Sequence, residues 1–288
     1  MASLSPAAPT GSQRNSSDAA LPPAQIPTRT GSNRRRFASL RTIVALMLRE
    51  MSTSYGRTPG GYIWAVLEPL TAILFLSLGF SLIIRTPSLG TSFLLFYATG
   101  YLPFDLYMQV SNTCARALGF SKPLLKYPAV TWLDAIFARF ILNSLTSIFV
   151  MLILLAGTLM ITDSRTVLDM PPVIEAVAMA MLLGLGVGTL NCALIGLYPL
   201  WSVTWGILTK PLFLASGIFF LYDDLPPLGQ DLLWYNPLMH ITGLMRSGFY
   251  PSYTAAHVNI TYVTLVSLVL LVLGLVLMGR YHRDILNR

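Results

Sequence analysis

Long apolar stretches dominate this chain and limit what it can fold into. The clearest runs from Val258 to Gly279 without one charged side chain. About 20 apolar residues in a helix cross the ~30 Å hydrocarbon core of a bilayer. Only 11% of the residues are charged, whereas a soluble protein has about 25%. The sequence therefore predicts an all-α integral membrane protein.

Six stretches are expected to be transmembrane helices, and they fill a transmembrane domain at 59–288. Their approximate ranges are 63–84, 93–114, 133–161, 173–198, 201–221 and 258–279. Basic residues gather in the N-terminal segment, in the loop between the second and third crossings, and in the C-terminal tail. Because positive charge favours the inner side of the membrane, both termini are predicted to be cytoplasmic.

Three further segments have patterns of their own. Residues 1–36 are rich in Pro, Ser, Ala and Thr and predict a disordered cytoplasmic tail. Residues 37–58 carry apolar side chains at spacings of three and four, which predicts an amphipathic interfacial helix; a core helix of a small soluble domain is the alternative. Residues 222–257 contain apolar residues and an Asn236-Pro237 helix start, which favours re-entrant or interfacial helices over a plain extracellular hairpin.

Several kinds of chemistry have no support in the sequence. None of the three lysines lies in a P-loop, so this chain cannot bind ATP in that way. The two cysteines and three histidines show no metal-ligand spacing, and no catalytic motif is present. No basic, aromatic-interleaved domain indicates nucleic-acid binding.

Four charged residues fall inside the predicted crossings, namely Glu68, Asp105, Arg139 and Lys210. A charge at the bilayer centre costs about 2.5–3.5 kcal/mol on insertion scales, so each is expected to pair or to face water. By depth, Glu68 could pair with Arg139, and Asp105 with Lys210. A polar coupling path and purely structural ion pairs both remain open.

A face of small residues recurs every four positions in the fourth crossing, at Ala176, Ala180, Gly184 and Gly188. Such faces allow helices to pack closely in lipid. The partner helix is either within the chain or in a second copy.

Several motifs together resemble those of ABC-2 type export permeases, especially the capsular polysaccharide export inner-membrane permeases. The motifs are Leu48-Arg49-Glu50, Tyr55-Gly56-Arg57, Gly61-Tyr62-Ile63-Trp64-Ala65-Val66-Leu67-Glu68-Pro69, Tyr127-Pro128 with Asp134 and Ala138-Arg139, Lys210-Pro211-Leu212, and Leu233-Trp234-Tyr235-Asn236-Pro237-Leu238. The resemblance runs from about residue 40 to the C-terminus, and Tyr235 is an extra residue relative to the pattern.

The resemblance implies a homodimer in a bacterial inner membrane, bound to a separate ABC ATPase subunit that holds ATP and Mg. The cargo would be a lipid-linked polysaccharide, and a periplasmic adaptor and an outer-membrane export protein would complete the path. The residues expected to take part in ATPase coupling are Arg49, Glu50, Arg57, Lys122, Lys126 and Tyr127.

Sugar rings stack on aromatic side chains, which suggests a set of channel residues near the crossing ends. These are Tyr62, Trp64, Tyr97, Tyr101, Phe104 and Tyr107. An aromatic belt at the membrane interface explains the same residues equally well.

Other functions remain as alternatives at this point. An ABC-2 permease could carry O-antigen, teichoic acid or a drug. A polytopic membrane enzyme acting on lipid-linked sugars would need clustered acids or a metal site, which the sequence does not show. A secondary transporter would need inverted repeats, and no clear repeat is present.

Overall fold

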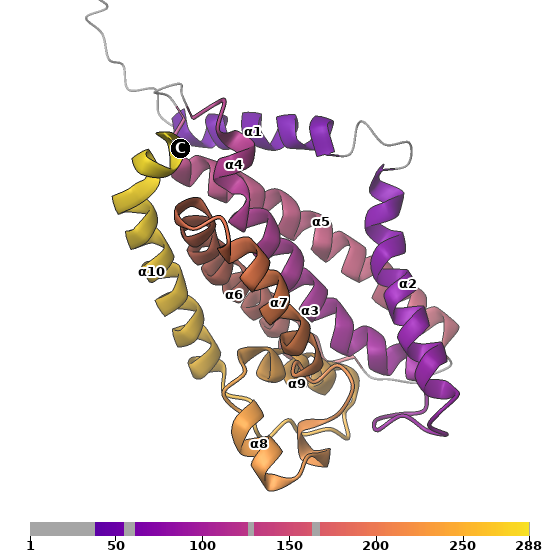
Figure 1. Cartoon of the computed structure of the whole chain (residues 1–288). Helices are drawn as coiled ribbons and strands as arrows, with labels where there is room; N and C mark the ends of the chain where they lie inside the picture. Colours follow the sequence, from indigo (N-terminus) through magenta and orange to yellow (C-terminus); the bar gives the residue numbers. More distant parts are fainter. Residues whose placement is uncertain (1–37, 55–60, 126–129, 163–167, 288) are drawn as a thin grey trace, which may run out of the picture. The chain divides into compact units, whose positions relative to one another are not determined.

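The computed structural model describes residues 38–54, 61–125, 130–162 and 168–287 (Figure 1). All regular elements in these residues are helical, which confirms the predicted all-α class. Residues 1–38 and 39–288 form separate units, and the second is described here. Its elements are α1 (Ala38–Ser54), α2 (Gly61–Ser81), α3 (Phe93–Ala115), α4 (Ala117–Ser121), α5 (Trp132–Ile161), α6 (Met170–Leu197), α7 (Trp201–Leu214), η1 (Tyr222–Asp224), α8 (Pro227–Leu233), α9 (Pro237–Phe249) and α10 (Ile260–Asn287). The predicted tail at 1–36 lies outside the described residues.

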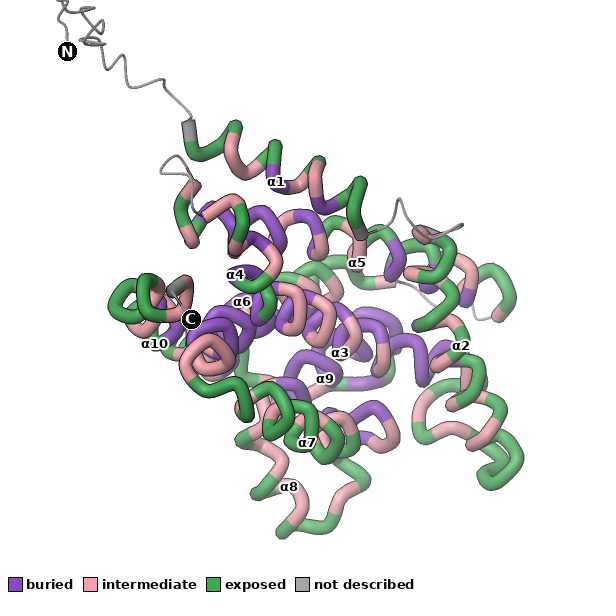
Figure 2. The backbone as a smooth tube through the Cα atoms, turned by 45° about the horizontal axis from the view of Figure 1, so that its top comes forward, coloured by how far each residue is buried: buried purple, intermediate pink, exposed green. Residues whose placement is uncertain are grey.

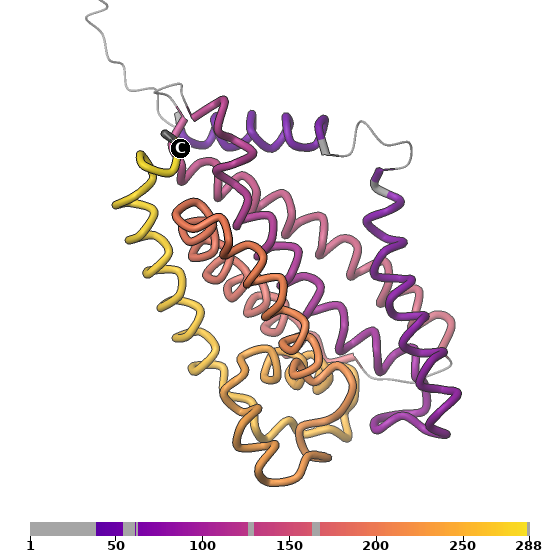
Figure 3. Tube along the Cα trace, in the orientation of Figure 1, coloured from indigo at the N-terminus to yellow at the C-terminus, as the bar shows by residue number. Residues whose placement is uncertain are grey.

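Helix α3 lies at the centre of the bundle, between α6 and α5 (Figure 3). It packs against α6, α5, α9 and α2, while α6 also packs against α10. Most of α3 is buried, whereas α7, α2 and α10 expose much of their surface (Figure 2). The central position explains why α3 tolerates polar side chains such as Asp105 and Gln109, because it faces protein more than its surroundings.

Four helices among the described residues are long and apolar enough to cross a membrane. They are Ile63–Ser81, Trp132–Ile161, Met170–Leu197 and Ile260–Leu286. They correspond to the first, third, fourth and sixth predicted crossings. The second predicted crossing is present as the helix α3, but it is more polar than these four.

The fifth predicted crossing, 201–221, is not one continuous helix. Helix α7 ends at Leu214 after 14 residues, a length of about 21 Å at 1.5 Å per residue. The chain then turns at Gly217, whose φ of 75° is easily adopted only by glycine. Asn236 and Thr242 donate hydrogen bonds to the carbonyls of Ala215 and Ser216, so the turn folds back onto α9.

The segment between α7 and α10 contains a buried helix, so the plain hairpin alternative is wrong. Helix α9 begins where predicted, with the Asn236 side chain accepting a hydrogen bond from the Leu238 N–H. Arg246 on α9 is only 2% exposed and donates to the carbonyls of Ile218 and Phe220, at 3.0 Å each. Its guanidinium also lies 4.1 Å from the centroid of the Phe96 ring on α3. These contacts fix the turn after α7 between α9 and α3.

The small-residue face of α6 packs within the chain. A Cβ on Gly188 would lie 2.8 Å from the Ser111 carbonyl oxygen of α3, and a Cβ on Gly186 would lie 2.5 Å from the Ser267 carbonyl oxygen of α10. Glycines on two faces of α6 therefore allow two neighbouring helices to approach its backbone closely. The question left open by the sequence is answered in favour of an intrachain partner for Gly188.

We expect Gly188→Ala to destabilise the bundle, because the added methyl group must displace the backbone of α3. Overpacking of this kind costs about 1–3 kcal/mol. Gly157→Ala is the matched control, since a Cβ at Gly157 meets nothing within 4 Å. Thermal unfolding of both variants in detergent measures the effect, and equal melting temperatures would contradict the close packing of α3 and α6.

Candidate functional site

Helix α1 is attached to α5 at two points. The Ser39 hydroxyl donates a hydrogen bond to the Asp134 carboxylate near the start of both helices. Further along α1, Glu50 forms an ion pair with Arg139 of α5, and its Oε1 atom lies 3.0 Å from Arg139 Nε. Between them, Leu46 provides a buried apolar contact. The amphipathic helix is thus held to the bundle by both polar and apolar groups.

Asp134 is positioned by the local sequence at the start of α5. The Thr131 side chain accepts a hydrogen bond from the Asp134 N–H, and the Asp134 carboxylate accepts one from the Thr131 N–H at 3.0 Å. This capping box satisfies two backbone donors that the first helical turn leaves free. It also fixes the position of the Asp134 carboxylate, which accepts the hydrogen bond from the Ser39 hydroxyl.

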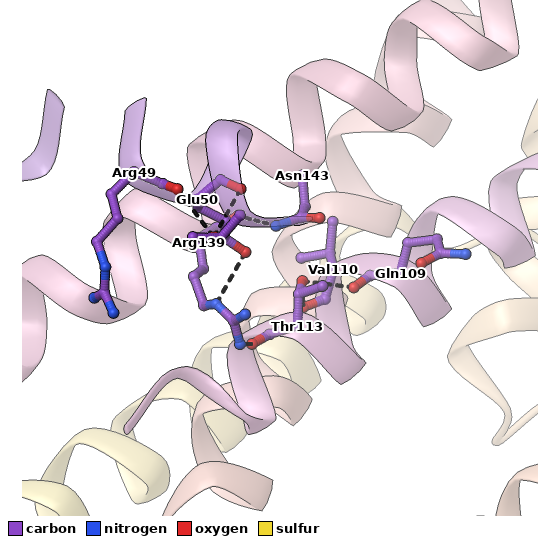
Figure 4. Close-up of polar contacts among 8 residues, drawn as sticks. Arg49, Glu50, Gln109, Val110, Thr113, Arg139 and Asn143 are labelled. Atoms are coloured by element: carbon purple, nitrogen blue, oxygen red, sulfur yellow. Dashed lines mark hydrogen bonds and ion pairs between the residues drawn. The ribbon is translucent and has the colours of Figure 1, made fainter. Parts of the chain in front are cut away.

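Arg139 of α5 contacts three other helices, and Figure 4 shows its polar contacts with Glu50 of α1 and Thr113 of α3. Besides pairing with Glu50 of α1, its Nη1 atom donates to the Thr113 carbonyl of α3 at 3.0 Å. Its Cζ atom lies 4.3 Å from the centroid of the Phe120 ring in α4. We call Glu50, Thr113, Phe120 and Arg139 the α1 junction.

The charged groups of the α1 junction are buried, so the loss of either one is costly in free energy. Glu50 is 5% exposed and Arg139 is 8% exposed. Removing one partner of a buried ion pair leaves an uncompensated charge and costs about 3–5 kcal/mol. The attachment of α1 therefore depends on both charges being present.

The structure places part of the predicted ATPase-coupling set near this junction. The Arg49 guanidinium lies 5.4 Å from the centroid of the Phe120 ring, and Lys122 follows α4 directly. Arg57, Lys126 and Tyr127 lie outside the described residues. The sequence did not identify Phe120 or Thr113, since a lone aromatic ring and a backbone carbonyl give no motif.

Both charge pairs considered from the sequence are absent in the described residues. Arg139 pairs with Glu50 and not with Glu68, because α1 lies across the start of α5. The sequence allowed only the depths of Glu68 and Arg139 in their crossings to be compared. These depths could not show that α1 approaches Arg139. Asp105 and Glu68 instead line one cavity of about 430 Å³ between α2, α3 and α5. Lys210 is exposed on α7 and forms no ion pair there.

The predicted channel aromatics lie in different environments. Tyr97, Phe104 and Tyr107 are buried, and Tyr101 is half-buried, with its ring centroid 6.3 Å from that of Phe213. Trp64 is 62% exposed on α2, and the structure does not describe the Tyr62 side chain. Trp64 is thus open to its surroundings, whereas Tyr97, Phe104 and Tyr107 are enclosed by neighbouring helices.

A second polar cluster, around His240, connects α8, α9 and α10 away from the α1 junction. His240 is 0% exposed. Its Nε2 atom lies 2.7 Å from the Trp234 carbonyl oxygen, and its Nδ1 atom accepts a hydrogen bond from the Asn259 N–H at 3.2 Å. This pattern requires a neutral ring with its proton on Nε2, because a protonated Nδ1 could not accept.

His257 lies next to this cluster. Its ring centroid is 5.9 Å from that of His240 and 4.2 Å from that of Tyr222, on which it stacks. Burial lowers the pKa of both histidines; His240 lowers the pKa of His257 further, while Asp223 opposes this. The spacing of these two histidines matches no ligand motif, so the sequence contains no signal for their proximity.

The comparison with known proteins identifies the family. Residues 41–250 match the ABC-2 type transporter family. The chain belongs to this family. The match begins within α1 and ends directly after α9, so it includes the α1 junction. This chain is accordingly a membrane subunit of a transporter and not an enzyme.

Curated relatives cover most of the chain. It is 30% identical to the polysialic acid transport protein KpsM of Escherichia coli over 236 residues, which are 82% of this chain and 92% of the relative. It is 27% identical to the capsule polysaccharide export inner-membrane protein CtrC of Neisseria meningitidis serogroup B, and 26% identical to BexB of Haemophilus influenzae, which has the same descriptive name. Each of these two alignments covers 85% of this chain and 92% of the relative.

We expect Glu50→Leu and Arg139→Leu each to lower the free energy of unfolding by about 3–5 kcal/mol, because each leaves a lone buried charge. The double variant should lose less than the sum of the two, since it buries no charge. Chemical unfolding in detergent micelles, analysed as a double-mutant cycle, measures this coupling. Arg280→Leu, at an exposed position of α10, is the control. Strict additivity of the two single effects would refute the ion pair.

The His240 cluster predicts a stability that depends on pH. Both histidines have a lowered pKa in the folded protein, so below the ordinary value of 6.5 the unfolded chain binds more protons. Stability should therefore fall as pH decreases through 6.5 and towards the lowered values. Melting temperatures between pH 7.5 and about 5 measure this slope. His240→Asn combined with His257→Asn should flatten it, whereas His282→Asn should not; an unchanged slope in the double variant would exclude this origin.

Proposed function

We propose that this chain is the transmembrane subunit of an ABC exporter that moves lipid-linked capsular polysaccharide across the inner membrane. The observation that carries the proposal is the family match over 41–250 together with relatives named for capsule or polysialic acid export. These relatives align over 92% of their own length, so the similarity extends to the whole permease.

The energy for export is proposed to come from a separate ABC ATPase. The sequence of this chain has no P-loop lysine, so ATP and Mg would bind to that partner. The working unit would be a homodimer of this chain with two ATPase copies. A periplasmic adaptor and an outer-membrane export protein would carry the polymer onward.

The proposed topology has six crossings and both termini in the cytoplasm. Within the part of the chain that the structure describes, four helices have the length and composition of spanning helices. Helix α3 would be the second crossing, shielded from lipid by its neighbours. Helix α7 would complete the fifth crossing together with the turn that Arg246 fixes, and α8 and α9 would be re-entrant or interfacial. Basic residues at the α1 side and in the C-terminal tail support this orientation.

Coupling to the ATPase is proposed at the α1 junction. Helix α4, Lys122 and Arg49 would contact the ATPase, and Arg57, Lys126 and Tyr127 are the other residues proposed to take part in coupling. Force applied to α4 would reach Arg139 through Phe120. Since Arg139 also holds α1 and α3, these helices would move together. Glu50 is buried and paired, so it is a positioning residue in this scheme.

The polymer is proposed to contact aromatic side chains along its path. Trp64 is exposed and Tyr101 is half-buried, which makes them the first contacts. The buried Tyr97, Phe104 and Tyr107 would join them after helix movement. Tyr62 is the remaining proposed contact. Stacking of sugar rings on aromatic faces makes few demands on sugar sequence, which suits a long polymer.

The proposal is tested by reconstituting this chain with the ABC ATPase of the same bacterium in lipid vesicles. Lipid-linked capsular polysaccharide should stimulate ATP hydrolysis and become transported only when both proteins are present. Lipid-linked O-antigen, offered in parallel, should give little stimulation. ATP hydrolysis by the permease alone, or equal transport of both polymers, would overturn the assignment.

The double variant Glu50→Leu and Arg139→Leu tests the coupling step in the same vesicles. It is expected to fold and to bind the ATPase, yet to lose at least about tenfold in transport per ATP hydrolysed, because the connection between α4, α1 and α3 is lost. Glu175→Gln and Arg280→Leu change exposed charges and should transport normally. Full transport by the double variant would eliminate the junction as the coupling path.

A further inference from the structure

Two charged side chains point out of the bundle from helices that are expected to lie in the membrane. Lys210 is on α7 and Glu68 is on α2, and both residues are exposed. Neither forms an ion pair with another residue that the structure describes. A charge that faces hydrocarbon is costly, so charged residues inside a membrane normally face protein or water. Each of these side chains therefore needs a partner outside this chain.

The two charges lie at similar depths. In the proposed topology, α2 and α7 both begin at the cytoplasmic side. Lys210 lies nine residues beyond Trp201, the first residue of α7, which is about 14 Å at 1.5 Å per residue. Glu68 lies seven residues beyond Gly61, the first residue of α2, which is about 10 Å. Both charges are thus inside the ~30 Å hydrocarbon core, and a lipid headgroup does not reach them.

Lys210 lies on the face of α7 that points away from the bundle. Helix α7 packs against α6, has no buried residue and is exposed along most of its length (Figure 2). At 3.6 residues per turn, Lys210 shares its side of the helix with Val203, Ile207 and Leu214, which are at least 60% exposed. A Cβ on Gly206, one turn before Lys210, would meet nothing within 4 Å. This face is apolar with one cation, and Gly206 leaves room for another helix to approach.

Glu68 lies on a corresponding face of α2. Trp64 and Phe75 are 62% and 75% exposed and lie on the same side of the helix as Glu68, together with the exposed Thr71. Asp105, the other acid at this depth, is half-buried behind α2 in the cavity between α2, α3 and α5. Glu68 is therefore the acid that a neighbouring molecule can contact.

The two faces complement each other but do not meet within one chain. Helix α2 does not lie beside α7 in Figure 1 or in Figure 2. In a two-fold symmetric dimer, each contact between one residue and a second residue occurs twice, with the subunits exchanged. A chain that exposes one cation and one carboxylate at similar depth can satisfy both charges with a second copy of itself. Hydrocarbon offers no opposite charge, so lipid cannot do the same.

We propose that two copies of this chain associate in the membrane with α7 of each copy against α2 of the other, so that Lys210 forms an ion pair with Glu68 of the partner subunit. The proposal rests on the homodimer of the proposed function and defines its interface. Two identical ion pairs form across the two-fold axis. Trp64 lies one turn nearer the cytoplasm than Glu68, so it stays at the cytoplasmic edge of this contact, where the polymer is proposed to enter.

Exchange of the two charges tests the pair. Copies that carry a donor or an acceptor dye at the C-terminus are mixed in lipid vesicles, and energy transfer measures their dimerisation. Glu68→Lys and Lys210→Glu should each weaken dimerisation about tenfold or more, because like charges then face each other. The double variant should recover wild-type affinity to within about threefold, since opposite charges face each other again. Unchanged dimerisation of both single variants, or no recovery in the double variant, would overturn the proposal.

Neutral variants identify the acid. Glu68→Gln should weaken dimerisation, whereas Asp105→Asn should not, because Asp105 lies behind α2. Glu175→Gln changes an exposed acid on α6 and is the matched control. Weakening by Asp105→Asn combined with normal dimerisation of Glu68→Gln would refute the assignment to Glu68.

Cross-linking locates the contact without relying on charge. Copies with Glu68→Cys are mixed with copies that carry Lys210→Cys and are oxidised with dipyridyl disulfide. Cross-linked dimers should form in this mixture and not from either variant alone, and the native Cys114 and Cys192 are buried. Leu265→Cys, at a position of α10 that is 57% exposed, should not cross-link to Glu68→Cys. Cross-linking to Leu265→Cys and not to Lys210→Cys would exclude this interface.

The dimerisation assays contain neither ATPase nor polysaccharide, so their outcome is separate from that of the transport assay. A wild-type chain that exports capsular polysaccharide, but whose dimerisation is unaffected by either charge change, would refute the ion pair and leave the proposed function intact. A chain that dimerises through this pair but does not export the polysaccharide would refute the cargo and leave the interface intact.

Discussion

The buried ion pair between Glu50 and Arg139 determines how the amphipathic helix is attached to the rest of the chain. A surface helix with one apolar stripe can lie on a membrane in many positions, since hydrophobic contact has no direction. A buried ion pair, in contrast, forms only when its two charged groups lie at the right distance and orientation, so it fixes where α1 lies. Because Arg139 also contacts α3 and α4, the position of α1 follows the position of those helices. A helix that would otherwise rest on the lipid surface is therefore part of the bundle.

The bundle separates its polar and apolar helices by position. Helix α3 carries Asp105 and Gln109 and is surrounded by α2, α5, α6 and α9. The more uniformly apolar α2 and α10 are the exposed ones. Buried polar groups are costly in lipid unless they are paired or reach water. Here they face either a neighbouring helix or the cavity beside α2, so the cost is limited.

The sequence predicted the helices well and their contacts poorly. Apolar length located both ends of α2, α5 and α6 and the start of α10 within about three residues, because the thickness of a bilayer constrains each run independently. Helix α10 continues to Asn287, beyond its predicted end at 279. Asn236-Pro237 predicted the start of α9 correctly, since capping is local chemistry. The end of α7 was wrong, because the turn at Gly217 depends on Asn236, Thr242 and Arg246, which follow later in the chain. The partner of Arg139 was missed for a similar reason. Its contacts come from α1 and α3, and the depth of a residue in the membrane does not show which helices are neighbours.

The close approach of α6 to two neighbours also decides which helices can move. Backbone-to-backbone contact at Gly186 and Gly188 leaves α6 no room to slide against α10 or α3 without separating both. Helix α2 has no such contact, exposes much of its surface and borders an open cavity. A rearrangement that widens this chain would therefore begin at α2, with α3, α6 and α10 remaining as a fixed frame. Mechanical work delivered at one end of the molecule would be concentrated on a helix that is only loosely packed against this frame.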